Sequence, residues 1–156
     1  MPTGGHISEA TPTDANGQPG ATRRHAGLLR RVGAMCYDAL LVVALWLVTL
    51  FPIVALSNSA VTGATVRSLL FIELFVFFAY FWVSRGQTLG MLAWRLRLVP
   101  AAPGEPVTLR QALLRFIGAL AAFATLGLGY LWMYIDPERR TWPDMLSGTR
   151  VIHEPR

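Results

Sequence analysis

The segment RRVGAMCYDALLVVALWLV, residues Arg30 to Val48, decides the fold class of this protein. After its two arginines the segment is almost wholly apolar, and the apolar run that begins at Val32 continues to Leu56. A helix of about 20 apolar residues can cross a hydrocarbon core of roughly 30 Å, so this run predicts a transmembrane helix. Asp38 lies inside the run, and a carboxylate at that depth is costly unless it has a partner or a function.

The composition also indicates a membrane protein of one domain. Of the 156 residues, 53% are hydrophobic and 15% are charged, whereas about 25% are charged in a typical soluble domain. A chain this short has too little interior to bury so much apolar surface, so part of it is expected to lie in lipid. The basic residues are all arginines, and they flank the apolar runs instead of forming one patch. We therefore expect the lipid bilayer as a partner and no nucleic acid.

Two further apolar runs follow the first. The run 66–83 predicts a second span, whereas the run 112–135 is too short for two full crossings and is interrupted by TLGLG at 125–129. Arginines before the first span and after the second predict a cytoplasmic N-terminus by the positive-inside rule. A single crossing by the third run would place Arg139 and Arg140 outside, against that rule. We therefore favour a re-entrant or in-plane helical hairpin over a plain third span, and we expect a cytoplasmic C-terminus.

Two short stretches have the character of β-strands. Arginine and leucine alternate in WRLRLV (Trp94 to Val99), and GTRVI (Gly148 to Ile152) is also β-prone, so the two are expected to pair into a small sheet at the membrane surface. Residues 1–27 contain few large apolar side chains and predict a disordered cytoplasmic tail. The membrane domain is then 28–153, with 154–156 as a tail end. The predicted fold class is an all-α integral membrane protein with two full spans, a re-entrant or third membrane segment, and this small β-pairing.

Asp38 needs a partner inside the bundle. Arg31 lies on the same helix face, but it is expected to snorkel toward the cytoplasmic headgroups. Arg115 enters the third run at similar depth from the same side and is the preferred partner of Asp38. Further charges for the same cytoplasm-facing cluster come from the segment DPERRTWPD, in which the candidates are Asp136, Arg139, Arg140 and Asp144.

Glu73 lies near the middle of the second span, among aromatic residues and without a basic neighbour on its own helix. One interpretation is a protonated side chain that is hydrogen-bonded to another helix. The other is a proton or cation site, because intramembrane carboxylates justify a functional hypothesis. The sequence leaves these two interpretations open.

Other chemistry is sparse in the sequence. The histidines are scattered in polar segments at His6, His25 and His153, so no metal site is expected. Neither a phosphate-binding glycine loop nor a nucleophile elbow is present. We therefore expect no enzyme activity and no cofactor.

Three motifs in the same order resemble those of the RDD family of small polytopic membrane proteins. They are RRVGAMCYD, with the spacing R-x-x-A-x-x-x-D, then SRGQTLGMLAWRLRLV after the second span, then DPERRTWPDMLSGTRVI. The resemblance covers roughly 29–152, and its one arginine and two aspartates map onto Arg31, Asp38 and Asp144. Pro143 stands where the family often has a histidine, so no role for a histidine at that point carries over.

The resemblance implies a multi-pass protein of the bacterial inner membrane, for which transport is the usual suggestion and sodium/proton exchange is linked with some members. Two functions are therefore kept. In the first, Asp38 and Glu73 handle protons or cations in a transport-related protein that acts as a homo-oligomer or with a partner. In the second, the charged cluster only fixes the fold of a structural or accessory module that binds another membrane protein.

Overall fold

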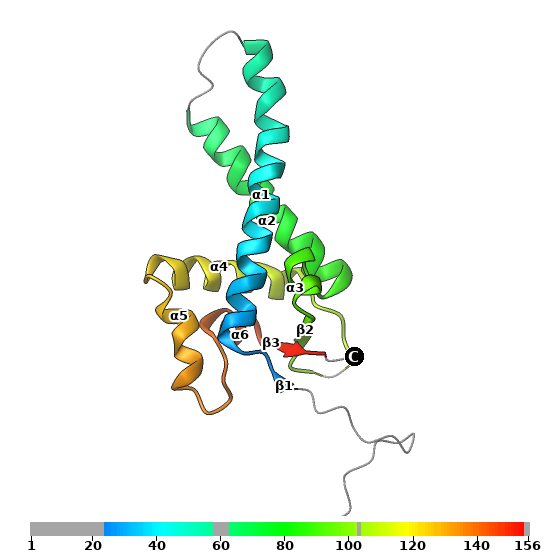
Figure 1. The fold of residues 1–156 in the computed structure, drawn as a ribbon, viewed down its shortest axis with the longest axis vertical. Helices are drawn as coiled ribbons and strands as arrows, with labels where there is room; N and C mark the ends of the chain where they lie inside the picture. Colours follow the sequence, from blue (N-terminus) through cyan, green and yellow to red (C-terminus); the bar gives the residue numbers. More distant parts are fainter. Residues whose placement is uncertain (1–23, 58–62, 103, 155–156) are drawn as a thin grey trace, which may run out of the picture.

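The computed structural model describes residues 24–57, 63–102 and 104–154. Two long helices, α1 (Leu28–Ser57) and α2 (Ala64–Arg85), project from a compact base that contains the other elements (Figure 1). Both helices are long and apolar enough to cross a membrane. They confirm the two predicted spans, although each helix begins a few residues earlier than the apolar run that predicted it.

The base contains a three-stranded antiparallel sheet with the order β1-β3-β2. Its strands are β1 (Arg24–His25), β2 (Leu96–Pro100) and β3 (Thr149–His153), and Leu98 faces Val151 in the register of β2 and β3. The predicted pairing of β2 with β3 is therefore confirmed. Strand β1 was not predicted, because two residues are too few to show a strand pattern, and the sequence analysis assigned them to the tail. Most of that tail, 1–23, lies outside the described residues.

The sheet brings distant parts of the chain to one end of the helix pair. Strand β1 immediately precedes α1, and β2 follows α2 after the short helix α3 (Leu89–Ala93). Strand β3, close to the C-terminus, lies between β1 and β2 and pairs with both. The start of α1, the end of α2 and the last strand are therefore held together at the base.

The third apolar run forms a bent pair of helices. It comprises α4 (Leu109–Ala124), α5 (Leu128–Leu131) and the 3-10 turn η1 (Trp132–Tyr134), with an angle of 110° between 109–124 and 128–134. The break lies in the predicted TLGLG stretch, where Leu126 and Gly127 have φ values of 55° and 87°. These left-handed conformations end a helix, and glycine adopts them without steric cost. Helix α4 runs crosswise to α1 in Figure 1 and packs on α6 (Trp142–Ser147).

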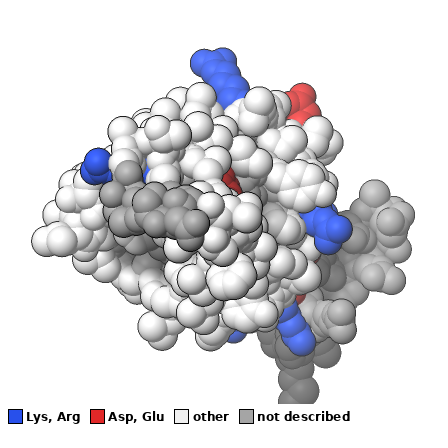
Figure 2. Space-filling model, turned by 90° about the horizontal axis from the view of Figure 1, so that it is seen from above, with Lys and Arg blue, Asp and Glu red and all other residues white. Residues whose placement is uncertain are grey.

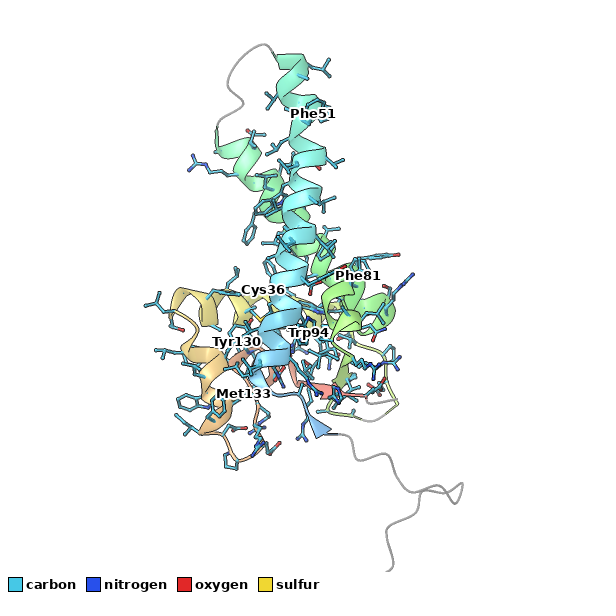
Figure 3. The ribbon with its side chains drawn as sticks, in the orientation of Figure 1. Cys36, Phe51, Phe81, Trp94, Tyr130 and Met133 are labelled. Carbon is cyan, nitrogen blue, oxygen red and sulfur yellow. The ribbon has the colours of Figure 1, made fainter. Side chains whose placement is uncertain are left out.

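The apolar core lies in the base, whereas the far halves of the long helices are exposed. Core side chains include Leu96, Leu98, Phe116 and Val151. Phe51, near the end of α1 remote from the base (Figure 3), is 77% exposed. Apolar side chains with this exposure are expected where lipid replaces water as the solvent.

Two helix contacts in the base depend on glycine because the helices approach so closely. A Cβ atom on Gly90 of α3 would collide with the carbonyl oxygen of Ala34 in α1 and would lie 2.8 Å from Cγ of Asp38. A Cβ atom on Gly118 of α4 would lie 2.9 Å from Cα of Pro143 in α6. Because backbone atoms cannot move aside as a flexible side chain can, these positions fix the distances between α1 and α3 and between α4 and α6.

We predict that Gly90→Ala lowers the thermal denaturation midpoint of the detergent-solubilised protein, because the added methyl group separates α3 from α1. Overpacking of this kind costs about 1–3 kcal/mol or more. The control is Gly27→Ala, since a Cβ atom at Gly27 has no atom within 4 Å. Equal midpoints for the two variants would contradict the close packing of α3 on α1.

Candidate functional site

The most strongly charged buried site lies where α1, α4 and α6 meet. Asp144 of α6 is 2% exposed, and each of its carboxylate oxygens accepts from a different arginine. Arg31 of α1 donates from Nη1 to Oδ2 at 2.6 Å, and Arg115 of α4 donates from Nη1 to Oδ1 at 2.6 Å. This Arg31–Asp144–Arg115 triad connects three helices that are far apart in the sequence.

Further hydrogen bonds tie the triad to the sheet and to α2. Arg31 donates from Nε to the carbonyl oxygen of Ala26 at 3.2 Å and from Nη2 to that of Val151 at 3.4 Å. Arg115 donates to Oγ1 of Thr149 at 3.0 Å, and its guanidinium carbon lies 5.4 Å from the ring centroid of Trp82 in α2. A guanidinium over an indole face is a favourable cation–π contact. The triad thus joins both spans to the base.

Local sequence places Asp144 in the first turn of α6. Thr141 precedes this helix, and its backbone N–H donates to Oδ2 of Asp144 at 3.2 Å. A carboxylate in the first turn is also stabilised by the positive end of the helix dipole. Pro143, which stands where the family resemblance led us to look for a histidine, is buried in the same turn and contacts α4 near Gly118.

The surroundings of Asp144 act on its pKa in opposite directions. Burial would raise the pKa, but the positive charges of Arg115 and Arg31, together with their hydrogen bonds, lower it from 3.8 to about 2. Asp144 is therefore ionised at neutral pH, and the triad carries one negative and two positive charges.

Asp38 does not pair with Arg115, so that prediction was wrong. Its Oδ1 accepts from the backbone N–H of Gly90 at 2.8 Å, and its Oδ2 accepts from the hydroxyl of Thr88. The same Thr88 hydroxyl accepts from the backbone N–H of Met91 at 3.1 Å as the N-cap of α3. Equal depth in the membrane did not decide the pairing, because α3 packs closely on α1 and saturates both oxygens of Asp38.

Only one of the four candidates in DPERRTWPD reaches the triad. Asp136 pairs instead with Arg140 at 3.1 Å, and this surface bond lowers the pKa of Asp136. Arg139 is exposed, has a φ of 52° and makes no ion pair within the described part of the chain. Of these four charged residues, only Asp144 belongs to the buried cluster, because it lies on α6, which packs on α4, whereas the other three precede that helix.

Glu73 occupies a separate position on the helix pair. Thr49 of α1 donates from Oγ1 to Oε1 of Glu73 at 2.7 Å, so the hydrogen bond to another helix that the first interpretation requires is present. The second oxygen, Oε2, is buried and has no hydrogen-bond partner among the described residues. Thr49 lies eleven residues after Asp38 on α1, or about 16 Å along the axis. Asp38 and Glu73 therefore do not form one site.

A cavity of about 320 Å³ opens beside the triad. Its walls come from α1, α2 and α4 and are apolar, with Val42, Phe78 and Phe123 among them. Its polar lining residues are Arg31, Asp38, Thr88, Arg115 and Tyr130. Tyr130 of α5 lies beside the lower part of α1 in Figure 3. In the described ranges, no group of three or more His, Cys, Asp or Glu side chains could hold a metal ion.

The sequence of this chain is similar to those of known proteins. A model of the RDD family matches residues 25–148. The chain belongs to the RDD family. It is also 29% identical over 76 residues to "Uncharacterized protein RP437" of Rickettsia prowazekii (strain Madrid E), a match that covers 49% of this chain and 42% of that protein. The chain thus spans less than half of that relative. No solved structure matches it significantly.

In this RDD protein, sequence reasoning found the charges but missed part of their surroundings. The three residues that the resemblance assigned to the family letters are all buried, and Arg31 and Asp144 contact each other directly. Thr88 and Gly90, which hold Asp38, were not singled out. The order threonine, leucine, glycine after a helix end is an N-cap signal that could have identified them.

We predict that Asp144→Asn destabilises the protein at neutral pH, because it leaves two buried arginines without a counter-charge. Breaking a buried pair in this way costs about 3–5 kcal/mol. The folded-state pKa is depressed, so the stabilisation by Asp144 is present above pH 4 and is lost as pH falls from about 4 through about 2. The denaturation midpoints of wild type and Asp144→Asn, measured between pH 7 and pH 2, should converge over that window.

The matched control is Glu138→Gln, which removes a carboxylate from a surface pair with Arg150. Exposed pairs contribute about 0–1 kcal/mol, so this variant should resemble wild type throughout. A gap between wild type and Asp144→Asn that stays constant down to pH 2 would show that the Asp144 charge is not what the arginines stabilise.

Proposed function

We propose that this RDD protein is a non-enzymatic accessory module of the bacterial inner membrane, in which the motif charges fix the fold and the two spans associate with another membrane protein, a second copy included. The observation that carries this proposal is that the charged side chains of the motif already have hydrogen-bond partners within the protein. Asp144 has an arginine on each oxygen, Arg31 donates to three acceptors, and both oxygens of Asp38 accept hydrogen bonds. Charges that are saturated by the fold are not free to bind and release a transported ion.

The exposure of the spans supports association. In the most apolar 18-residue windows, only 6% of α1 residues and 11% of α2 residues are buried inside the chain. Figure 2, which looks along the long axis, shows a largely uncharged surface, with most charged side chains toward its edge and one acidic group visible near the middle. Two helices that bury so little of each other's surface cannot shield an ion from lipid along a pathway. They do leave broad faces that can pack against another protein in the bilayer.

The distribution of arginines supports a cytoplasmic base. Among the described arginines, only Arg67, in the first turn of α2, lies near the end of the helix pair that is remote from the base. The others lie at the base, including Arg30 at the start of α1 and Arg85 at the end of α2. The positive-inside rule then favours a base in the cytoplasm. Since β3 pairs with β1, the N- and C-terminal segments belong on the same side.

We predict that a reporter that is active only in the periplasm stays inactive when fused after the C-terminal residue. The reason is that β3 pairs with β1, which precedes the first span, and with β2, which follows the second. A third complete crossing would place β3 on the opposite side of the membrane and prevent this pairing. The matched control fuses the same reporter into the loop between α1 and α2, where it should be active. High activity of the C-terminal fusion would overturn the proposed orientation.

A second candidate function rests on Glu73. The buried Oε2, which has no hydrogen-bond partner among the residues that the structure describes, is the kind of group that a proton or a cation would satisfy. This observation favours proton or cation handling at the contact between α1 and α2, at a distance from the saturated motif charges.

One pair of measurements separates the two functions. We predict that the protein, extracted in mild detergent, has a mass above that of the 17.2 kDa chain plus its detergent, through a second copy or a partner. Proteoliposomes of the purified protein should show no proton or sodium flux above empty vesicles. If a flux is present, if Glu73→Gln abolishes it and if the control variant Thr65→Val leaves it intact, the protein is a transporter and the accessory role is wrong. A mass equal to the single chain, with no flux, would overturn both.

A further inference from the structure

The cavity beside the triad has the length of a membrane lipid in one leaflet. Along α1 its lining runs from Arg31 to Trp46, fifteen residues or about 22 Å at 1.5 Å per residue. A bilayer is about 40–45 Å thick with its headgroups, so one leaflet is about 20–22 Å. The polar lining residues lie at the end near the base, and the lining that continues along α1 from Ala39 to Trp46 is apolar, which is the polarity of a lipid in the leaflet next to the base.

The cavity is open toward the surroundings of the helices. Val43 of α1 and Phe123 of α4 both line it, and they are 49% and 58% exposed. Val43 lies on a span, and Phe123 lies on α4, which packs against the other span and forms an apolar bent pair with α5. A molecule entering between α1 and α4 therefore comes from the hydrocarbon phase, and its chain meets walls such as Val42 and Phe123.

At the polar end, hydrogen-bond donors remain unused. In the described part of the chain Arg115 donates only from Nη1, so its Nε and Nη2 groups have no acceptor. Tyr130, which also lines the cavity, makes no hydrogen bond through its hydroxyl within the same ranges. The two neighbouring charges are already occupied, Arg31 by three acceptors and Asp38 by two donors. What is lacking is an acceptor for the free edge of Arg115.

We propose that the cavity binds one anionic phospholipid from the leaflet next to the base. Its phosphate accepts from Arg115 and Tyr130, and one acyl chain follows the apolar walls toward Trp46. Guanidinium groups bind phosphate through paired N–H donors, which suits the open Nε and Nη2 edge. Arginines that surround the base, such as Arg30 and Arg85, favour anionic over zwitterionic lipid near the opening. This inference rests on the membrane placement and not on the proposed protein partner.

The test uses the full-length, delipidated protein in a neutral detergent, titrated with phosphatidylglycerol or with phosphatidylcholine of identical acyl chains. Native mass spectrometry counts the bound lipids. We expect one phosphatidylglycerol per chain, bound at least tenfold more tightly than phosphatidylcholine. Ala39→Trp should weaken that binding at least tenfold, because Ala39 lines the cavity. Ala44→Trp is the matched control, since Ala44 is equally an exposed alanine of α1 but does not line the cavity.

Each of the following results would overturn the proposal. Equal binding of the two lipids would show that no anion site exists. Unchanged phosphatidylglycerol binding in Ala39→Trp would place the lipid elsewhere. Displacement of the lipid by millimolar inorganic phosphate would make the site one for a soluble anion. If Ala39→Trp does not accumulate, Tyr130→Phe removes a single hydroxyl and should weaken phosphatidylglycerol binding at least threefold, and no change would likewise overturn the proposal. A failed search for a protein partner would not affect any of these measurements.

Discussion

The structure depends on one carboxylate that neutralises two buried arginines. Asp144 bridges Arg31 of α1 and Arg115 of α4, and the arginines in turn hold β3 and the indole of Trp82. A buried guanidinium without a counter-charge is very unfavourable, so the three side chains form a unit in which each requires the others. The apolar core of the base is small, so the buried ion pairs of the triad add to its stability. The same ion pairs attach both spans to the base.

The sheet imposes a second constraint on the path of the chain. Because β3 pairs with β1 and β2, the segment between β2 and β3 must begin and end at the sheet. Helix α4 and the bent α5 segment meet this requirement by turning at Leu126 and Gly127, with α4 crosswise to the spans. The backbone N–H groups of the reversal are satisfied within the turn itself, because Leu126 donates to the carbonyl oxygen of Phe123 and Gly127 to that of Ala122, as an irregular segment near lipid requires.

The sequence was sufficient to predict those features that depend on the periodicity or the length of an apolar pattern. Hydropathy located both spans, alternation located β2, and the TLGLG stretch located the break after α4. The partner of Asp38 was not predictable, because equal depth along two helices says nothing about which helix faces which. Only the close packing of Gly90 on Ala34 selects Thr88 and Gly90 over Arg115. Arg115 was recognised as a buried charge but assigned to the wrong aspartate, and β1 is too short to have any pattern.

The sequence separation inside the triad affects biosynthesis. Asp144 follows Arg31 by 113 residues along the chain. At about 5–20 residues per second, translation reaches Asp144 roughly 6–23 s after Arg31. The first span thus leaves the ribosome well before its counter-ion is made, and during that interval Arg31 has to be solvated by water or by lipid headgroups. The base therefore assembles late, after the spans have inserted. A nascent chain that ends before Asp144 would contain both spans but would lack the carboxylate that holds Arg31 and Arg115.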